Sequence, residues 1–283
     1  MHSFALDRSD GTPRVGVLIN PSGDCEPQLL QIAAWAAKYD VATVDLGTSA
    51  DPTDEDPGCQ LVIALGGDGT ILRALQLAML GHAAVLGVNF GHVGFLADVD
   101  RAGFAGALEG IAAGDAVVDE RTALVAVFET DEPHWVVAFN DVVVARLPGH
   151  GNARLRIRIG DDPLLQLNGD GVVVASPTGS TAYTVGAGGP AVAPSLDAIV
   201  LTPLATQGSP LRSLVVDGSD QVRVEIAPSS APLSVEIDGR TIDGLPTSAT
   251  LVVHAAPRKA RLVRSRQRTF YSDLAGAIPM SAR

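Results

Sequence analysis

The chain has 283 residues, which is enough for one large domain or two. Its 46% hydrophobic and 18% charged residues can form a sizeable core, so general disorder is excluded. The formal net charge of −12 argues against a protein that binds nucleic acid or an anionic membrane, because such proteins need a basic surface.

Residues 1–115 alternate between strand and helix patterns. Apolar runs predict strands at 14–20, 41–46, 60–65 and 84–89. Apolar residues at helical spacing predict helices at 28–38, 70–80 and 102–113. Apolar strands separated by helices are typical of a parallel sheet covered on both faces, so this region predicts an α/β domain.

From about residue 116 the apolar residues repeat at every second position. Leu155, Ile157 and Ile159, for example, alternate with arginines. Short strand patterns separated by Gly, Pro and Asp are typical of an antiparallel sandwich, so we expect an all-β sandwich over residues 116–268. A short helix from residue 270 onward is expected to pack back on the first domain, which residues 269–283 then complete.

A Gly-rich segment at residues 61–73 has the sequence LVIALGGDGTILR. A buried strand is expected to end at Leu65, two glycines let the backbone turn, and a helix follows. Free N–H groups at a helix start attract phosphate, and Asp68 among them could hold a metal ion or accept a proton from an attacking hydroxyl. The structural alternative is an ordinary strand–helix turn in which Asp68 caps the helix.

A second polar loop lies at residues 169–190, with the sequence GDGVVVASPTGSTAYTVGAGGP. Its strand, 172–175, runs into a concentration of hydroxyls, glycines and backbone donors, a set suited to sugar hydroxyls and phosphates. Tyr183 could stack on a ligand or donate a hydrogen bond to it. The structural alternative is a turn-rich connection within the sandwich.

Several residue types set further limits. The only lysines are Lys38 and Lys259, and neither lies in a Gly-rich loop, which excludes a P-loop nucleotide site. The histidines show no zinc-binding pattern, and Cys25 and Cys59 are too few for a disulfide scaffold. Because the N-terminus lacks the apolar stretch of a signal peptide, we expect free thiols and a cytoplasmic protein.

Two further features are expected to be structural. The basic run RKARLVRSRQR at residues 258–268 could suggest a nucleic-acid surface, but the acidic balance of the whole chain favours a solvated strand pair. His92, which lies between Gly91 and Gly94, is expected to be a loop residue near the ligand rather than a metal ligand.

Together these motifs resemble those of the NAD kinase family. In family order they are GGDGT at 66–70, GVNFGHVGFL at 87–96, Asn140-Asp141, Asp170-Gly171, SPTGSTAY at 176–183 and Gly188-Gly189-Pro190. Asp238-Gly239 and Phe270-Tyr271 also fit, so the resemblance spans residues 14–276. GGDGT is shared with diacylglycerol kinases, sphingosine kinases and phosphofructokinases, whereas PTGSTAY in the same chain is the specific motif.

The resemblance implies transfer of a phosphoryl group from ATP, or in some members from polyphosphate, to the 2′-hydroxyl of the adenosine ribose of NAD, which makes NADP. It also implies a divalent metal ion, Mg²⁺ or Mn²⁺, and a homodimer or homotetramer, with no nucleic-acid or membrane partner. A lipid kinase of the GGDGT group is one alternative, although it gives no reason for the PTGSTAY block. A non-catalytic dinucleotide-binding regulator is another, and it would tolerate the loss of Asp68.

The resemblance assigns roles to particular residues. Asp68 is the expected catalytic base, and Asp170 is expected to reach the site of a neighbouring subunit. The expected NAD- and nucleotide-binding residues are Asp68, Gly69, Arg73, Phe95, Asn140, Asp141, Arg154, Asn168, Asp170, Thr178, Thr181, Ala182, Tyr183, Thr184, Val185, Gly186 and Ala205. No residue is assigned as a metal ligand.

Some positions depart from the family pattern. Asp141 stands where glutamate is usual, and its shorter side chain bears on NAD affinity more than on activity. Ser176 replaces a common threonine, and Asn168 occupies a position that is often arginine. Residues 204–213 lack a histidine that is often found there, with Gln207 near its place.

Overall fold

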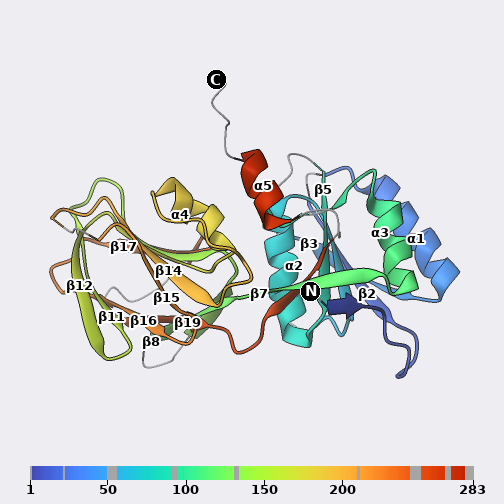
Figure 1. Ribbon diagram of the computed structural model, residues 1–283, viewed down its shortest axis with the longest axis horizontal. Helices are drawn as coiled ribbons and strands as arrows, with labels where there is room; N and C mark the ends of the chain where they lie inside the picture. Colours follow the sequence, from blue (N-terminus) through green and yellow to red (C-terminus); the bar gives the residue numbers. More distant parts are fainter. Residues whose placement is uncertain are drawn as a thin grey trace, which may run out of the picture. The chain divides into compact units, whose positions relative to one another are not determined.

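The computed structural model describes residues 2–21, 23–49, 56–90, 95–97, 99–130, 134–208, 211–242, 250–264 and 269–277. The chain divides into two compact units, residues 1–120 with 260–283 and residues 121–259. The units correspond to the α/β and β regions expected from the sequence, and their strands and helices can be followed in Figure 1.

The first unit is built on an eight-stranded, mainly parallel sheet. Its strands are β1 (His2–Phe4), β2 (Arg14–Ile19), β3 (Ala42–Thr48), β4 (Leu61–Leu65), β5 (Ala84–Asn89), β6 (Val99–Asp100), β7 (Ala116–Arg121) and β20 (Ala260–Arg264). The order is β1-β7-β20-β5-β4-β2-β3, with β6 beside β5. The pairs among β2 to β6 and between β20 and β5 are parallel, whereas β1 and β7 pair antiparallel at the edge.

Helices cover both faces of this sheet. Those that do so are α1 (Glu26–Tyr39), α2 (Asp68–Gly81) and α3 (Phe104–Ala113), and the unit also contains α5 (Phe270–Ala277). Trp35 of α1 and Leu108 of α3 pack with Ile63 and Leu86 in one core cluster. Helix α2 lies on the opposite face, where a Cβ at Gly87 would meet Ile71 at 2.6 Å (Figure 1). The expected α/β domain with a parallel sheet is therefore confirmed.

The second unit contains two six-stranded antiparallel sheets. One has the order β15 (Leu214–Asp217), β14 (Ala198–Leu204), β13 (Gly171–Ala175), β10 (Asp141–Arg146), β17 (Leu233–Ile237) and β18 (Arg240–Ile242). The other has the order β12 (Asp162–Gly169), β11 (Ala153–Ile159), β16 (Gln221–Ile226), β19 (Thr250–Ala255), β8 (Leu124–Glu129) and β9 (His134–Ala138). Apolar residues from both sheets, among them Val144, Val174, Leu155 and Val224, form one core, as expected of a sandwich.

The observed boundaries differ from those expected from the sequence. The expected domains were 1–115 with 269–283, and 116–268. Strand β7 instead pairs with β1, and β20 pairs with β5, so both strands belong to the first sheet. The basic run was therefore wrongly expected to be a solvated strand pair, because Leu262, Val263 and Arg264 are buried; residues 265–268 lie outside the described residues.

Two further findings concern the cysteines and the possibility of a membrane-spanning helix. Cys25 and Cys59 are buried free thiols, as expected. Within the described ranges, no helix is both long enough and apolar enough to cross a membrane.

Candidate active site

The Gly-rich loop lies at the carboxyl end of the fully buried strand β4. Helix α2 begins at Asp68, and its N-cap is Gly67, so the structural alternative in which Asp68 caps the helix is not observed. A Cβ at Gly66 would meet the Thr70 Oγ1 at 2.4 Å, so close packing against Thr70 requires a glycine at this position. A Cβ at Gly67 or Gly69 would meet no described atom within 4 Å, so these two glycines leave the backbone open to a ligand.

The Asp68 carboxylate turns toward the segment that follows β5. The backbone N–H groups of Phe95, Leu96 and Ala97 donate to it. Burial raises the pKa of Asp68, and these three hydrogen bonds act in the opposite direction. Its Oδ1 atom is buried and has no hydrogen-bond partner in the described part of the chain. A buried oxygen of this kind is suited to an incoming hydroxyl or cation.

Two other residues expected at the site belong to the same unit as Asp68. Arg73 lies on α2, and its Nη1 donates to the Gln76 Oε1 at 2.8 Å. Phe95, whose N–H donates to Asp68, accepts a hydrogen bond at its carbonyl from the Arg264 Nη1 at 3.4 Å. His92 lies outside the described residues, so its expected position near the ligand stays a prediction.

In the second unit the structure brings Asn140 and Asp141 against the polar loop that begins at Ser176. The Ser176 N–H donates to the Asn140 carbonyl at 2.9 Å. A Cβ at Gly179 would lie only 1.9 Å from the same carbonyl oxygen, so only glycine fits there. The Tyr183 N–H donates to the Asp141 carboxylate. The loop expected to bind sugar and phosphate therefore packs directly on the Asn-Asp pair.

One carboxylate fixes the backbone of this pair. Asp238 follows β17 in the left-handed backbone region, with a φ of 49°. Its Oδ1 accepts hydrogen bonds from the N–H groups of Phe139 at 3.0 Å, Asn140 at 2.7 Å and Asp141 at 3.2 Å. Its own N–H donates to the Asp141 carbonyl at 3.0 Å. The motif Asp238-Gly239 therefore holds the Asn140–Asp141 turn in place.

Asp141 itself is 5% exposed. Burial, with a further contribution from the charge of Asp238 and a smaller one from Glu236, raises the pKa of its carboxyl to about 7, against the hydrogen bond from the Tyr183 N–H. The side chain therefore changes between neutral and ionised forms near neutral pH.

This pKa predicts how stability depends on pH. The folded state disfavours the ionised form of Asp141, so wild-type stability is lost as the pH rises from about 4 through about 7. Asp141→Asn removes that loss. We expect the difference in the free energy of unfolding, variant minus wild type, to increase by more than about 1 kcal/mol from pH 5 to pH 8. Urea denaturation at each pH measures this difference. A difference that stays constant over this range would contradict the raised pKa.

The residues after Gly179 form a 3-10 turn, Gly179–Thr181, and the short helix α4, Tyr183–Gly186. Tyr183 and Val185 are each 47% exposed, which leaves the tyrosine ring available to a ligand. Thr178 and Thr184 are buried, and each hydroxyl oxygen has no hydrogen-bond partner among the described residues. Thr181 donates to the Thr178 carbonyl at 3.1 Å.

The remaining expected residues of this unit form a separate group. Arg154 of β11 faces Asn168 of β12, and Gln207 donates through its N–H to the Asn168 carbonyl. Ala205 follows β14 in the left-handed backbone region, with a φ of 43°. The Asp170 carboxylate pairs with the Arg146 Nε at 2.6 Å.

The two groups lie at opposite ends of β13. Asp170 precedes that strand, and Ser176 follows it. At about 3.3 Å per residue, the six steps between them span about 20 Å. One chain therefore does not bring Asp170 next to Asp141.

The sequence motifs missed several residues that shape these groups. Arg146 and the pair Arg264–Asp273 belong to no motif. Asp238 belongs to the Asp238-Gly239 motif, but that motif does not indicate its role. A cavity of about 320 Å³ on the β11–β12 hairpin, lined by residues such as Arg156 and Leu164, contains none of the expected site residues.

An α/β unit with an acidic Gly-rich loop, in a chain with an antiparallel β unit rich in buried hydroxyls, defines the class of GGDGT phosphotransferases. The family profile described as ATP-NAD kinase N-terminal domain matches residues 30–116, and that described as ATP-NAD kinase C-terminal domain matches residues 139–265. The chain belongs to the NAD kinase family.

Individual relatives support this assignment, and solved structures share the fold. The NAD kinase of Heliobacterium modesticaldum is 35% identical over 277 residues, 93% of this chain and 97% of its own length. That of Leifsonia xyli subsp. xyli is 39% identical over 235 residues, 81% of this chain and 75% of its own length. The fold matches yeast NADH kinase complexed with NADH, with a TM-score of 0.82, 22% identity and coverage of 97% and 90% of the two chains. It also matches an Archaeoglobus fulgidus NAD kinase in complex with ATP, with a TM-score of 0.74, 22% identity and coverage of 93% and 97%.

Proposed function

We propose that the protein is an ATP-dependent NAD kinase in which Asp68 is the general base for the ribose 2′-hydroxyl. A ribose hydroxyl is a poor nucleophile, and a carboxylate within hydrogen-bond reach is worth roughly 10²–10⁴-fold in rate. The observation that carries this role is the buried Oδ1 of Asp68, which lacks a hydrogen-bond partner among the described residues. A substrate hydroxyl would supply that partner.

The donor phosphates need positive charge and N–H donors. The open backbone at Gly67 and Gly69, at the start of α2, suits the phosphates of ATP or polyphosphate. Among the described residues, no three His, Cys, Asp or Glu side chains gather into a metal cage. Mg²⁺ commonly takes many of its ligands from substrate phosphates and water. We therefore propose that Mg²⁺ or Mn²⁺ binds with the donor and neutralises its charge.

NAD recognition is assigned to the residues expected from the family. The turn at Asn140 and Asp141 offers an amide and a carboxylate to ribose hydroxyls, and Tyr183 offers an exposed ring. The other proposed contacts are Gly69, Arg73, Phe95, Arg154, Asn168, Asp170, Thr178, Thr181, Ala182, Thr184, Val185, Gly186 and Ala205. The unpartnered hydroxyls of Thr178 and Thr184 support a polar ligand beside this loop.

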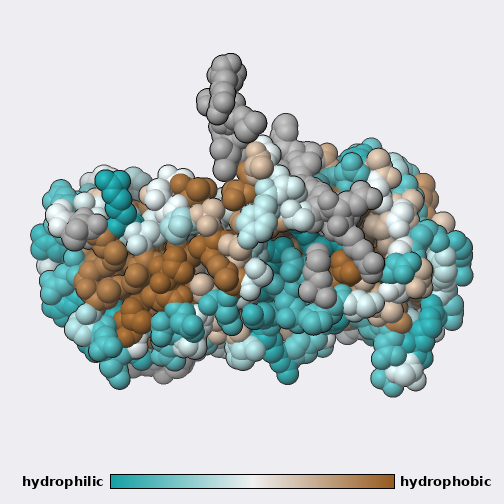
Figure 2. All heavy atoms as spheres, in the orientation of Figure 1, coloured by the Kyte–Doolittle hydropathy of each residue, from teal (hydrophilic) through white to brown (hydrophobic). Residues whose placement is uncertain are grey.

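We also propose that the active protein is a homodimer or homotetramer. Asp170 lies at the far end of β13 from the Asn140–Asp141 turn, which supports its use by a neighbouring subunit. Figure 2 shows hydrophobic side chains gathered on one face of the β unit. Exposed apolar residues of this unit include Val215 at 46% and Leu196 at 54%. An apolar face of this kind suits a subunit interface.

Mixing two defective variants tests the shared site. Asp68→Asn and Asp170→Asn each remove one proposed contribution, so we expect each homo-oligomer to be strongly impaired. If Asp170 serves the neighbouring subunit, random mixed dimers restore about a quarter of wild-type activity, because half are mixed and each has one intact site. Co-refolding followed by steady-state assay measures this. A mixture no more active than its parents, or a fully active monomer in sedimentation, would contradict the shared site.

One assay tests the activity itself. NAD, ATP and Mg²⁺ are incubated with the protein, and NADP is read by a coupled dehydrogenase. Formation of NADP supports the proposal, and its absence beside measurable NAD binding would favour the regulator. The lipid-kinase alternative is not favoured, because both family profiles that match are those of ATP-NAD kinases.

The cytoplasm is the proposed location. Cys25 and Cys59 are buried free thiols, which suits a reducing compartment.

A further inference from the structure

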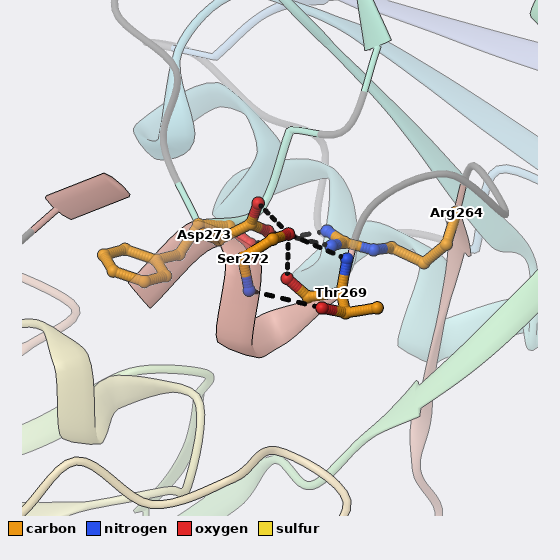
Figure 3. Close-up of polar contacts among 5 residues, drawn as sticks. Arg264, Thr269, Ser272 and Asp273 are labelled. Carbon is orange, nitrogen blue, oxygen red and sulfur yellow. Dashed lines mark hydrogen bonds and ion pairs between the residues drawn. The ribbon is translucent and has the colours of Figure 1, made fainter. Parts of the chain in front are cut away.

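A buried ion pair lies next to residues 95–97, the segment whose N–H groups contact Asp68. The Arg264 Nη2 and the Asp273 Oδ2 are 3.3 Å apart, and their side chains are only 4% and 7% exposed. Arg264 ends β20, and Asp273 lies in the first turn of α5 (Figure 3). The pair therefore joins the sheet of the first unit to its last helix.

The start of α5 is fixed by its own hydrogen bonds. The Thr269 N–H donates to the Ser272 Oγ at 3.1 Å, and the Ser272 N–H donates to the Thr269 Oγ1 at 3.2 Å. This reciprocal arrangement resembles a capping box and sets where the helix begins (Figure 3). Asp273, one residue further on, is thereby presented to Arg264.

Arg264 also reaches the segment beside Asp68. Its Nη1 donates to the Phe95 carbonyl at 3.4 Å. The opposite side of the same segment donates the N–H groups of Phe95, Leu96 and Ala97 to the Asp68 carboxylate. One short piece of backbone therefore has its carbonyl on Arg264 and its N–H groups on Asp68.

We propose that Arg264 is a positioning residue for Asp68: paired with Asp273, its guanidinium holds the Phe95 carbonyl and thereby aims three successive N–H groups at the Asp68 carboxylate. The planar guanidinium suits this role, because two of its nitrogens reach two different acceptors at once. A lysine ammonium keeps the charge beside Asp273 but does not reproduce that fork. The catalytic part of this inference rests on the proposed function.

Arg264→Lys is the informative variant, because it keeps the positive charge beside Asp273, whereas deleting either charge of this buried pair would endanger folding. We expect kcat to fall about tenfold in an otherwise wild-type protein. In the Asp68→Asn background the same change should alter the residual rate less than twofold, since its effect acts through Asp68. A purely structural role would lower both rates by the same factor. Equal losses in the two backgrounds would overturn the proposal.

A second measurement does not depend on activity. Amide hydrogen exchange should become about tenfold faster at Leu96 and Ala97 in Arg264→Lys, while amides in β4 remain unchanged. Lys38→Gln is the control, because Lys38 pairs with Glu109 on the surface of the same unit, at 3.0 Å. Unchanged exchange at residues 95–97, or a uniform increase through the unit, would overturn the positioning role even if the wild type made no NADP.

Discussion

Asp68→Asn is expected to lower kcat by roughly 10²-fold or more while the protein stays folded and still binds NAD. The substitution keeps the shape of the side chain and an oxygen that can accept the N–H groups of Phe95, Leu96 and Ala97. It removes the charge that favours departure of the hydroxyl proton. Because burial already raises the pKa of Asp68, a neutral amide is well tolerated at this position. Steady-state turnover and direct NAD titration on the same preparation measure the two effects separately.

Asp45→Asn is the matched control. Asp45 lies on β3 of the same unit, where it is exposed and its Oδ1 accepts the Gly47 N–H at 2.8 Å. The same change of charge there should leave kcat within about twofold of wild type, because surface substitutions away from the site have small effects. If Asp68→Asn turned over within a few-fold of wild type, Asp68 would not be the base. A loss of NAD binding equal to the loss of kcat would assign it a binding role instead.

The regular elements of the first unit could be predicted closely from sequence. The strand expected at 84–89 is observed at Ala84–Asn89, and that expected at 60–65 at Leu61–Leu65. These strands are buried on both faces, so their apolar runs are continuous and bounded by polar residues. Helix α2 begins at Asp68, two residues before the expected start at residue 70. The flexible glycines allow the first helical turn to include the end of the Gly-rich loop.

The pairing of distant segments was harder to predict. Strand β20 has the composition of a basic surface strand, with Arg261 and Arg264 among its five residues. Its place inside the first sheet depends on β5, about 180 residues earlier, and no local periodicity carries that information. The charge of Arg264 is tolerated there only because Asp273 and the Phe95 carbonyl receive its N–H groups.

In the candidate site, too, some residues could be predicted from local sequence, whereas others depend on contacts between distant segments. Asp68, Asn140, Asp141 and the loop at 176–186 stand in motifs, so the sequence identifies them. The role of Asp238 was not predictable, because its carboxylate acts on N–H groups about 98 residues away through a left-handed backbone conformation. The pKa of Asp141 likewise follows from burial and from charges on β17 and just after it, which only the folded structure specifies.

Gly179→Ala is expected to lower NAD affinity by about 10²-fold and to destabilise the β unit by about 1–3 kcal/mol. The added methyl group would lie 1.9 Å from the Asn140 carbonyl oxygen and 2.5 Å from the Asn140 Cα. These are backbone atoms, so no side-chain rotation relieves the overlap. The Asn140 turn is also held by Asp238, at 2.7 Å from the Asn140 N–H, so it cannot move away without breaking that hydrogen bond.

Gly151→Ala separates this effect from the general consequence of replacing a glycine in the β unit. A Cβ at Gly151 would meet nothing within 4 Å, and its backbone does not have a positive φ. We expect that variant to bind NAD as wild type does and to unfold within about 0.5 kcal/mol of it. Calorimetric NAD titration and urea denaturation give both quantities for each protein. The substitution at Gly179 acts first on the Asn140–Asp141 turn, because the nearest atoms to the added methyl group are those of Asn140. If Gly179→Ala bound NAD within a few-fold of wild type, this turn would therefore not be part of the NAD site.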